Sequence, residues 1–308
     1  MLGFLTSRLR VLLVALVLFL GSIPASAQKH SDIENIGKRD INKGSWNIYS
    51  LEREIELGQR LAADVERTSR LLADHEVNAY IRALSERLVR NSDAHVPFTV
   101  KVIDSEEINA FALPGGHLYV NTGLILEAHS EAELAGILAH EIAHVTARHA
   151  VEQVSKAQIF NWLSLPLIFI GGPVGYAIQQ AMGIAVPLTF LKFSRNAERE
   201  ADFLGLQYTY KAGYDPVAMI DFLERLKLKE KKRVPAIFSS HPMTKDRIQR
   251  AEQAIAKVLP AREEYVVTTS SFERIQKRLL ELHGWESIYQ FDAAEGPTLR
   301  RRTESPAH

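Results

Sequence analysis

The sequence has 308 residues, of which 46% are hydrophobic and 24% charged, and its 37 Lys and Arg residues balance 37 Asp and Glu residues. A neutral chain offers no electrostatic attraction for nucleic acid, and this composition excludes a disordered protein. The sequence contains no cysteine, which excludes disulfides, thiolate metal ligands and a cysteine nucleophile. The length allows one large domain or two small ones, and either can bury a core.

Residues 1–27 differ in composition from the rest of the chain. Two arginines precede an unbroken apolar run over residues 11–20, and an Ala-x-Ala sequence follows at residues 25–27. These features are typical of a cleaved signal peptide. The uncharged stretch 11–28 is also near the minimum length of a membrane span, so an uncleaved anchor facing the periplasm is the alternative. A secreted chain without cysteine is expected in a bacterial periplasm.

Two helices and two strands are predicted in the first half of the remaining chain. Residues 28–49 show no apolar period and are expected to form a loose arm. Apolar residues then recur at helical spacing over residues 50–88, which predicts two amphipathic helices. Strands are predicted at 98–103 and 117–121, the second after a Pro-Gly-Gly turn at 114–116.

A capping-box signature opens the next helix. Ser130, with Glu133 three residues later, predicts a helix that runs to about residue 155. The other elements expected are helices at about 194–211, 217–229, 243–258 and 271–283, and a strand at 264–269.

Residues 157–191 carry no charged side chain and are interrupted by several glycines and prolines. Two membrane spans of about 20 residues each do not fit in this length. The stretch therefore favours a soluble lid or buried loop that covers a cleft, and peripheral contact with a membrane is the alternative.

His140, Glu141 and His144 form a His-Glu-x-x-His sequence in the helix that begins near Ser130. A four-residue step places both imidazoles on one helix face, where they can bind one zinc ion while the glutamate reaches its water. The alternative is an ordinary amphipathic helix. Apolar neighbours on the other faces favour a buried helix, in which histidines need partners.

A catalytic zinc site needs three protein ligands and an open position for water. His149 lies five residues after His144, about 140° around an ideal helix, so it is expected to point elsewhere. The metzincin pattern would require a glycine and a further histidine where this chain has Ala147 and Ala150, which excludes that class. The better candidate for the third ligand is Glu198.

The sequence around Glu198 has the pattern Ser-Arg-x-x-Glu-x-x-Ala-Asp over residues 194–202. Here the chain resembles the gluzincin metallopeptidases of the HtpX, BepA and CAAX prenyl protease type. The resemblance makes Glu198 the third ligand rather than Glu200. Asp202 is expected on the same helix face, where its carboxylate can accept a hydrogen bond from a ligating imidazole. The alternative is a solvated face of salt bridges.

Two further segments fit the same resemblance. The segment that begins at Asn109 and Ala110, together with the strand that contains His117 and Tyr119, resembles the edge strand that pairs with an extended peptide substrate. An ordinary buried hairpin is the alternative. His241, in a Ser-His-Pro sequence, resembles a histidine that lies near the metal in related proteins. It would stabilise the oxyanion or occupy the open zinc position as a latency switch, and a helix-capping histidine is the alternative.

The resemblance implies an α+β, predominantly helical fold, a zincin-like metallopeptidase domain whose small sheet has an edge strand beside the active-site helix. This domain is expected at 50–260, followed by a strand-helix extension at 261–291 and a disordered tail at 292–308. The implied function is a zinc-dependent endopeptidase with one zinc ion per subunit. Its polypeptide substrates would be misfolded or stalled envelope proteins, including outer-membrane proteins and their assembly machinery. The alternative is a holdase or assembly factor with little proteolysis.

Overall fold

The computed structural model describes residues 33–43, 45, 47–156, 193–229, 237, 241–242, 245–284 and 299–301. The expected signal peptide and the uncharged stretch 157–191 lie outside the described residues. The chain divides into two units, Met1–Glu34 and Asn35–His308, and every helix and strand below belongs to the second unit. Within the described ranges, no helix combines the length and the apolar character that a membrane crossing requires.

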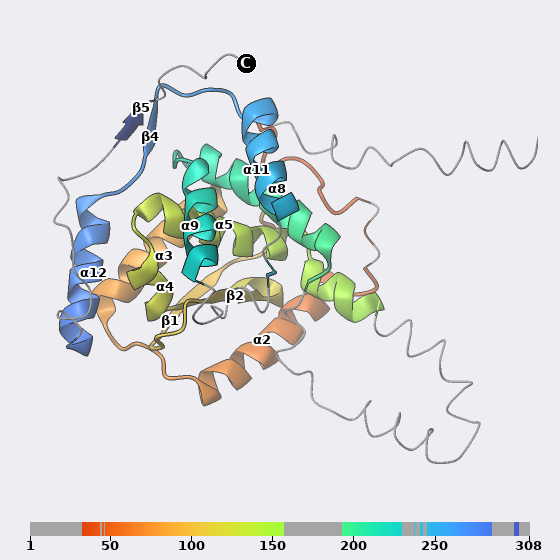
Figure 1. The fold of residues 1–308 in the computed structure, drawn as a ribbon. Coiled ribbons are helices and arrows are strands. Elements are labelled where there is room, and N and C mark those ends of the chain that lie inside the picture. The colour runs from red at the N-terminus through yellow and green to blue at the C-terminus, as the bar shows by residue number, and fades with distance from the viewer. Residues whose placement is uncertain are drawn as a thin grey trace, which may run out of the picture. The chain divides into compact units, whose positions relative to one another are not determined.

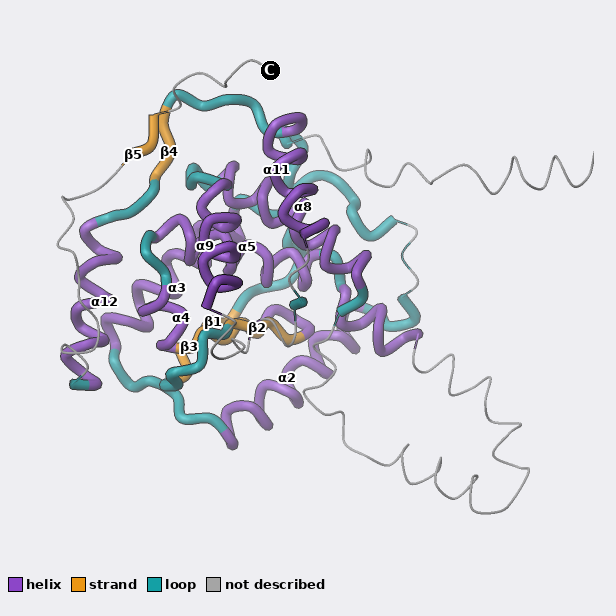
Figure 2. Tube along the Cα trace, viewed as in Figure 1, coloured by secondary structure: helices purple, strands orange, loops and turns teal. Residues whose placement is uncertain are grey.

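Helices make up most of the described chain, and a small sheet lies among them (Figure 1 and Figure 2). The predicted helices all form, within a few residues of their expected ends. The helices are α2 (Leu51–Thr68), α3 (His75–Arg90), α4 (Thr122–Glu127), α5 (Glu131–Thr146), α8 (Arg195–Lys211), α9 (Val217–Lys229), α11 (Lys245–Val258) and α12 (Ser270–His283).

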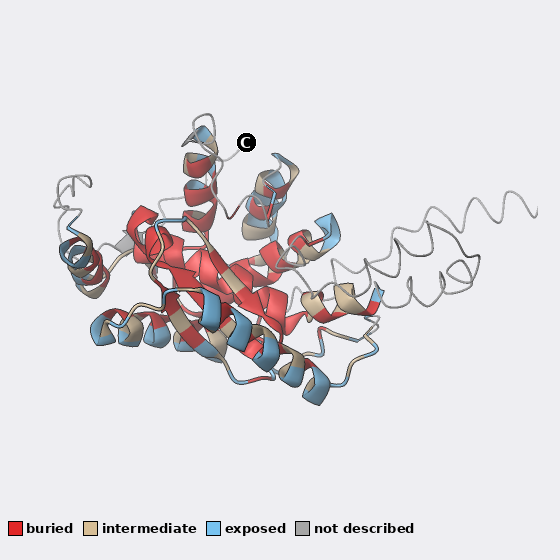
Figure 3. Ribbon diagram, turned by 90° about the horizontal axis from the view of Figure 1, so that it is seen from below, coloured by how far each residue is buried: buried red, intermediate tan, exposed pale blue. Residues whose placement is uncertain are grey.

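Helix α5 forms the buried centre of the fold, and all 16 of its residues are buried (Figure 3). It begins with the predicted capping box. The Ser130 side chain accepts a hydrogen bond from the Glu133 backbone N–H, and the Glu133 carboxylate accepts one from the backbone N–H of His129. Burial on every side follows from its sequence, because small and aliphatic residues surround the few polar ones.

Two glycines let later helices lie directly against α5. At Gly205 of α8, a Cβ atom would come within 3.1 Å of the backbone of His140. At Gly136 of α5, a Cβ atom would come within 2.6 Å of the Met219 Cβ atom on α9. The close approach of α8 brings the segment that contains Glu198 to the helix that contains His140.

A three-stranded sheet lies beside α5. Its strands are β1 (Thr99–Ile103), β2 (Ala110–Leu113) and β3 (His117–Asn121), in the order β1-β3-β2. Strand β3 pairs parallel with β1 and antiparallel with β2. The predicted strand 117–121 is therefore the central strand, and β2 is the edge strand that contacts α5.

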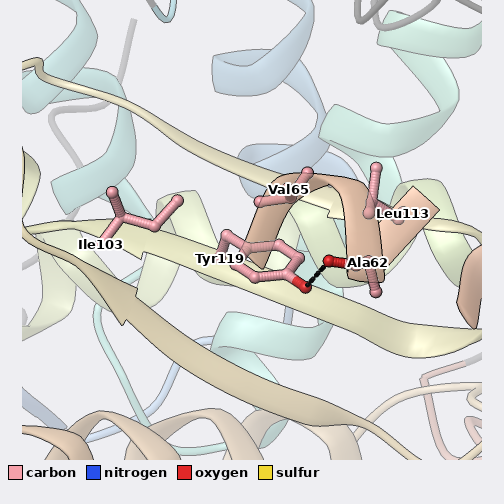
Figure 4. Close-up of a cluster of buried hydrophobic side chains, with 5 residues drawn as sticks. All are labelled: Ala62, Val65, Ile103, Leu113 and Tyr119. Carbon is pink, nitrogen blue, oxygen red and sulfur yellow. Dashed lines mark hydrogen bonds between the residues drawn. The ribbon is translucent and has the colours of Figure 1, made fainter. Parts of the chain in front are cut away.

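Helix α2 covers the face of the sheet opposite α5. Figure 4 shows the Tyr119 side chain beneath α2, in a cluster with Ala62, Val65, Ile103 and Leu113. The Tyr119 hydroxyl donates to the Ala62 carbonyl at 3.4 Å. This apolar cluster fixes the sheet against α2 and leaves its other face for α5.

The segment expected to be a loose arm is anchored to the domain. The carboxylate of Asp93, which is 0% exposed, accepts hydrogen bonds from the Gly37 backbone N–H, the Arg39 guanidinium and the Tyr208 hydroxyl. A buried carboxylate with charged and neutral donors makes a strong anchor. Apolar periodicity does not report such polar anchoring, which explains the wrong expectation.

The predicted helix 130–155 is broken. Helix α5 ends at Thr146, two turn residues follow, and residues 149–156 are helical again. Arg148 has a φ of 56°, in the left-handed region that non-glycine residues rarely adopt. Its guanidinium donates to the buried Glu54 carboxylate and to the Tyr49 carbonyl. These two contacts hold the break in place.

Part of the tail expected to be disordered forms a strand. Residues Leu299–Arg301 form β5, which pairs antiparallel with β4 (Glu264–Val266). An edge strand such as β4 offers unpaired backbone groups, and pairing with β5 satisfies them. Helix α12 lies between these strands in the chain, and its Gln276 donates hydrogen bonds to the carbonyls of Ile125 and Ala128.

Candidate metal centre

Four side chains from three parts of the chain meet in one buried cluster. Their ligand atoms lie within 4.8 Å of one another, and all four residues are buried. The two α5 histidines bring their Nε2 atoms to 3.0 Å apart. The residues of the cluster are His140, His144, Glu198 and His241.

The hydrogen bonds behind the two α5 histidines set their tautomers. His140 Nδ1 lies 3.0 Å from the Asp202 carboxylate, so we assign its proton to Nδ1. His144 Nδ1 lies 3.0 Å from the Nδ1 atom of His149, and we assign a proton to that contact. Both Nε2 atoms then face each other as lone pairs. Such an arrangement fits a cation between them, and imidazole with carboxylate is a donor set that zinc prefers.

The electrostatics of the cluster also favour a positive charge. Burial alone lowers the pKa of His140, but hydrogen bonds and charges from Asp202 and Glu198 raise it to about 9. Burial alone raises the pKa of Glu198, but hydrogen bonds from His140 and His241 hold it far below its usual range. The surroundings thus stabilise an ionised carboxylate and a cationic partner, which is what a divalent metal needs.

A buried ion pair supports His140. Arg247 donates two hydrogen bonds of 2.7 Å to the Asp202 carboxylate. Arg247 also lies 3.0 Å from the Glu198 carboxylate and donates to the His241 carbonyl. Burial alone raises the pKa of Asp202, but the Arg247 charge and its hydrogen bonds lower it. Asp202 therefore stands as an ionised acceptor behind His140, the place the sequence predicts for it.

A neutral group supports His144. His149 Nδ1 contacts it as described, and His149 Nε2 lies 3.3 Å from a Glu200 carboxylate oxygen. The Phe193 ring stacks on His144 with centroids 3.9 Å apart. Burial, followed by the charges at His140 and His149, lowers the pKa of His144 well below its usual range. The imidazole is thereby held in the neutral form that binds metal.

The expectation that His149 points away from His144 is wrong. It assumed one continuous helix, whereas the left-handed residue Arg148 turns the chain and returns His149 to the α5 face. His149 is not among the four clustered ligands, so it acts behind His144 rather than at the metal position. The sequence gives no signal for this break, because arginine has no preference for positive φ.

Glu141 lies beside the cluster with its carboxylate buried. It accepts a hydrogen bond from the Ala112 backbone N–H on β2, and burial raises its pKa. A carboxylate with a raised pKa takes up a proton more readily, as a general base must. His241 Nε2 lies 3.3 Å from the Glu141 carboxylate, while its Nδ1 lies 2.9 Å from that of Glu198. His241 therefore bridges the proposed base and the ligand cluster.

The structure separates the residues expected to bind substrate. Asn109 and Ala110 lie at the start of the edge strand β2, but His117 and Tyr119 lie on the central strand β3. The His117 ring contacts the Thr99 hydroxyl, and Tyr119 points toward α2. A substrate strand cannot pair with β3, because both of its edges are occupied. The prediction for His117 and Tyr119 is therefore wrong.

Comparison with known proteins agrees with this geometry. A model of peptidase family M48 matches residues 75–255. The beta-barrel assembly-enhancing protease of Escherichia coli (strain K12) is 29% identical over 231 residues, which cover 72% of this chain and 47% of that protein. The putative beta-barrel assembly-enhancing protease of Vibrio cholerae is 33% identical over 245 residues, covering 75% and 50%.

A eukaryotic relative is also similar. The mitochondrial metalloendopeptidase OMA1 of Schizosaccharomyces pombe is 29% identical over 231 residues, which cover 72% of this chain and 67% of that protein. The chain spans about half the length of the bacterial relatives it matches. A mostly helical domain with a small mixed sheet and this buried cluster is typical of the zincin fold.

Proposed function

The chain belongs to peptidase family M48, and from this premise we propose that it is a zinc-dependent endopeptidase that cleaves polypeptides. One observation carries the proposal. The buried carboxylate of Glu141 stands beside a cluster of imidazole and carboxylate ligands, and a purely structural metal site has no need of a base there. We assign the ligand roles to His140, His144 and Glu198, for one zinc ion per chain.

The protein's own groups hold and move protons. When bound, zinc supplies a Lewis acid that acidifies water and polarises the scissile carbonyl. Glu141 takes a proton from water and returns it to the leaving amine, and the Ala112 N–H keeps its carboxylate in position. Asp202 keeps the His140 Nδ1 proton in place, so that Nε2 remains free for the metal.

His241 has two candidate roles, and its position favours one of them. Its Nδ1 atom lies among the ligand atoms, 3.3 Å from His140 Nε2 and 2.9 Å from a Glu198 oxygen. A side chain placed there is suited to occupy the open metal position as a latency switch. Stabilisation of the oxyanion remains the second role, and it requires His241 to move away from the other ligands.

The substrates we propose are misfolded or stalled proteins of the cell envelope. Two relatives are called beta-barrel assembly-enhancing proteases, which supports outer-membrane proteins and their assembly machinery as partners. The catalytic domain would comprise residues 50–260, with a strand-helix extension at 261–291. A signal peptide at 1–27 would direct the chain to the periplasm. Peripheral membrane contact through 157–191 belongs to the same proposal as its alternative form.

The decisive experiment compares wild type with Glu141→Gln. The variant keeps the shape of the side chain but not its basicity, so zinc content should stay at one ion per chain. Cleavage of unfolded casein should fall by about 10²- to 10⁴-fold. Metal analysis and a gel-based cleavage assay measure the two quantities. Retained proteolysis in Glu141→Gln would refute the assigned base.

A holdase with little proteolysis is the competing function, and the same assay separates the two. Wild type would then suppress casein aggregation without cleaving it. Because His241 would also silence a latent protease, His241→Ala is tested alongside. Chelator-sensitive cleavage in either protein supports the peptidase, and cleavage in neither supports the holdase.

Localisation is tested on cells that produce the full chain. We expect release of the mature protein with the periplasmic fraction and recovery in the supernatant after alkaline carbonate extraction. Recovery in the carbonate pellet would instead support the membrane-anchored alternative.

A further inference from the structure

A small apolar pocket adjoins the metal cluster. Its walls include Ile137 from α5 and two side chains of α9, Met219 and Leu223, and the metal-side wall is formed by His140 and His241. The cavity that remains measures only about 10 Å³. This is at or below the volume that holds one water molecule, so the pocket is already filled with side-chain atoms.

Ile237 is the side chain that closes this pocket. It contributes to the pocket wall and is 3% exposed. Four residues later the chain reaches His241, whose backbone N–H donates to the Ile237 carbonyl at 2.9 Å. The segment that places His241 in the ligand cluster thus also places an isoleucine in the neighbouring pocket.

Main-chain pairing holds Ile237 beside the edge strand. Its backbone N–H donates to the Ile108 carbonyl at 3.2 Å. The Asn109 carbonyl accepts from the Asn121 N–H on the extension of β3, so the alternating Ile108 carbonyl faces outward. The Ala112 N–H, on the same outward edge, donates to Glu141. The outward edge therefore begins at Ile237 and ends at the proposed base.

This combination of contacts is how a sheet edge recognises an extended peptide. Backbone hydrogen bonds along the edge hold the chain, and a pocket selects the side chain. Ile237 uses both, and it does so next to the metal ligand His140. Its position marks where a substrate residue beside the scissile bond would place its side chain.

The walls define which side chain fits. Met219 cannot retreat toward α5, because it packs against Gly136 of that helix. The charged group near the pocket, Arg247, is already paired with Asp202. The pocket therefore offers apolar contact and no free charge partner, so a charged residue entering it would lose its hydration without compensation.

We propose that the pocket formed by Ile137, Met219 and Leu223 is the specificity subsite of this enzyme, and that it selects an aliphatic side chain of isoleucine size next to the scissile bond. The inference rests on the proposed peptidase function. Such a pocket discriminates by about 10- to 200-fold per methylene gained or lost.

The test uses the full-length, zinc-loaded protein and a mixture of unstructured peptides, with cleavage sites identified by mass spectrometry. We expect Ile, Leu, Val and Met to be enriched at one position beside the cleaved bond, and charged residues to be depleted there. Leu223→Ala enlarges the pocket, so kcat/KM for a Phe peptide relative to its Ile counterpart should rise about tenfold or more.

Leu226→Ala is the matched control. Leu226 is buried on the same helix but does not line the pocket, so the variant should lose stability without changing the preferred residue. If Leu223→Ala does not fold, as judged by circular dichroism, Leu223→Val replaces it and should shift the preference in the same direction.

The outcomes separate the two levels of the argument. Cleavage by wild type with no side-chain preference, or a preference that Leu223 variants leave unchanged, overturns the subsite and leaves the peptidase standing. Absence of cleavage by wild type and by His241→Ala overturns the peptidase function itself, and the subsite with it.

Discussion

The two histidines of α5 share one metal position, but the groups that hold them differ in kind. Behind His140 stands a buried carboxylate, Asp202, gripped by Arg247 through two hydrogen bonds of 2.7 Å. This support is ionic and buried, and it joins α8 to α11.

The support behind His144 is neutral and leads to the surface. His149 contacts its Nδ1 atom, and the next group along, Glu200, is 40% exposed. Its geometry depends on the backbone break at Arg148 rather than on a salt bridge.

The difference shows that two ligands of one type need not be equal. Asp202 and Glu198 raise the pKa of His140 against the effect of burial, whereas burial lowers that of His144. A more basic imidazole is the stronger metal ligand. We therefore expect the support of His140 to contribute more to metal affinity than the support of His144.

The largest effect is expected for Asp202→Ala. The variant removes the acceptor behind His140 and leaves the buried Arg247 without its bidentate partner. Zinc affinity should fall about 100-fold, measured by competition with a chelator. The free energy of unfolding in chelator should fall by about 3–5 kcal/mol, measured in urea. A zinc affinity within threefold of wild type would contradict the proposed inequality.

Asp93→Ala separates stability from metal binding. This side chain is also fully buried and also pairs with an arginine, Arg39, but it does not contact any of the clustered ligands. Its loss should lower the free energy of unfolding by a similar amount, about 3–5 kcal/mol, because Arg39 is left unpaired. Zinc affinity should stay within threefold of wild type in the folded protein. If it falls as far as in Asp202→Ala, the loss in that variant reflects general destabilisation.

His149→Ala should have a smaller effect on metal binding than Asp202→Ala. The variant removes the hydrogen bond that orients His144, while the Phe193 ring still stacks on it. We expect zinc affinity to fall about tenfold, in the lower part of the range for groups behind a ligand. The same chelator competition measures it. A loss equal to that of Asp202→Ala would show that the two supports are equivalent.

The smallest effect is expected for Glu200→Gln. Its carboxylate is partly exposed and lies 3.3 Å from His149, so solvent already screens their interaction. Zinc affinity should change less than threefold, and the change should shrink further as salt is raised from 0.05 to about 0.5 M. A tenfold loss would mean that the charge of Glu200 reaches the metal position.

Much of the fold follows from local signals in the sequence. The Ser130 capping box and the Ser194 cap set the starts of α5 and α8, as predicted. Helical periodicity gives α2 and α3, because each buries one face only. The spacing of His140, Glu141 and His144 on α5 and the second motif around Glu198 are also local patterns, and the close packing of α8 on α5 brings them together.

The features that the sequence does not predict depend on distant partners. The break at Arg148 exists because Glu54 and Tyr49 bind its guanidinium. The central position of β3 depends on pairing with β1 across the β2 hairpin, which no local pattern encodes. Helix α4, a fully buried six-residue helix, has no polar face that would give it a period.

The Asp93 anchor has a consequence for the order of folding. It joins positions 39, 93 and 208, and the metal cluster joins 140, 198 and 241, so both close long loops of chain through the same helix, α8. Closing long loops is entropically costly and slow. We expect backbone amides of the arm and of α5 to gain protection from hydrogen exchange in one step, when α8 docks. A chain that emerges from a membrane in an extended state would therefore acquire its metal ligands only after its first two hundred residues have passed.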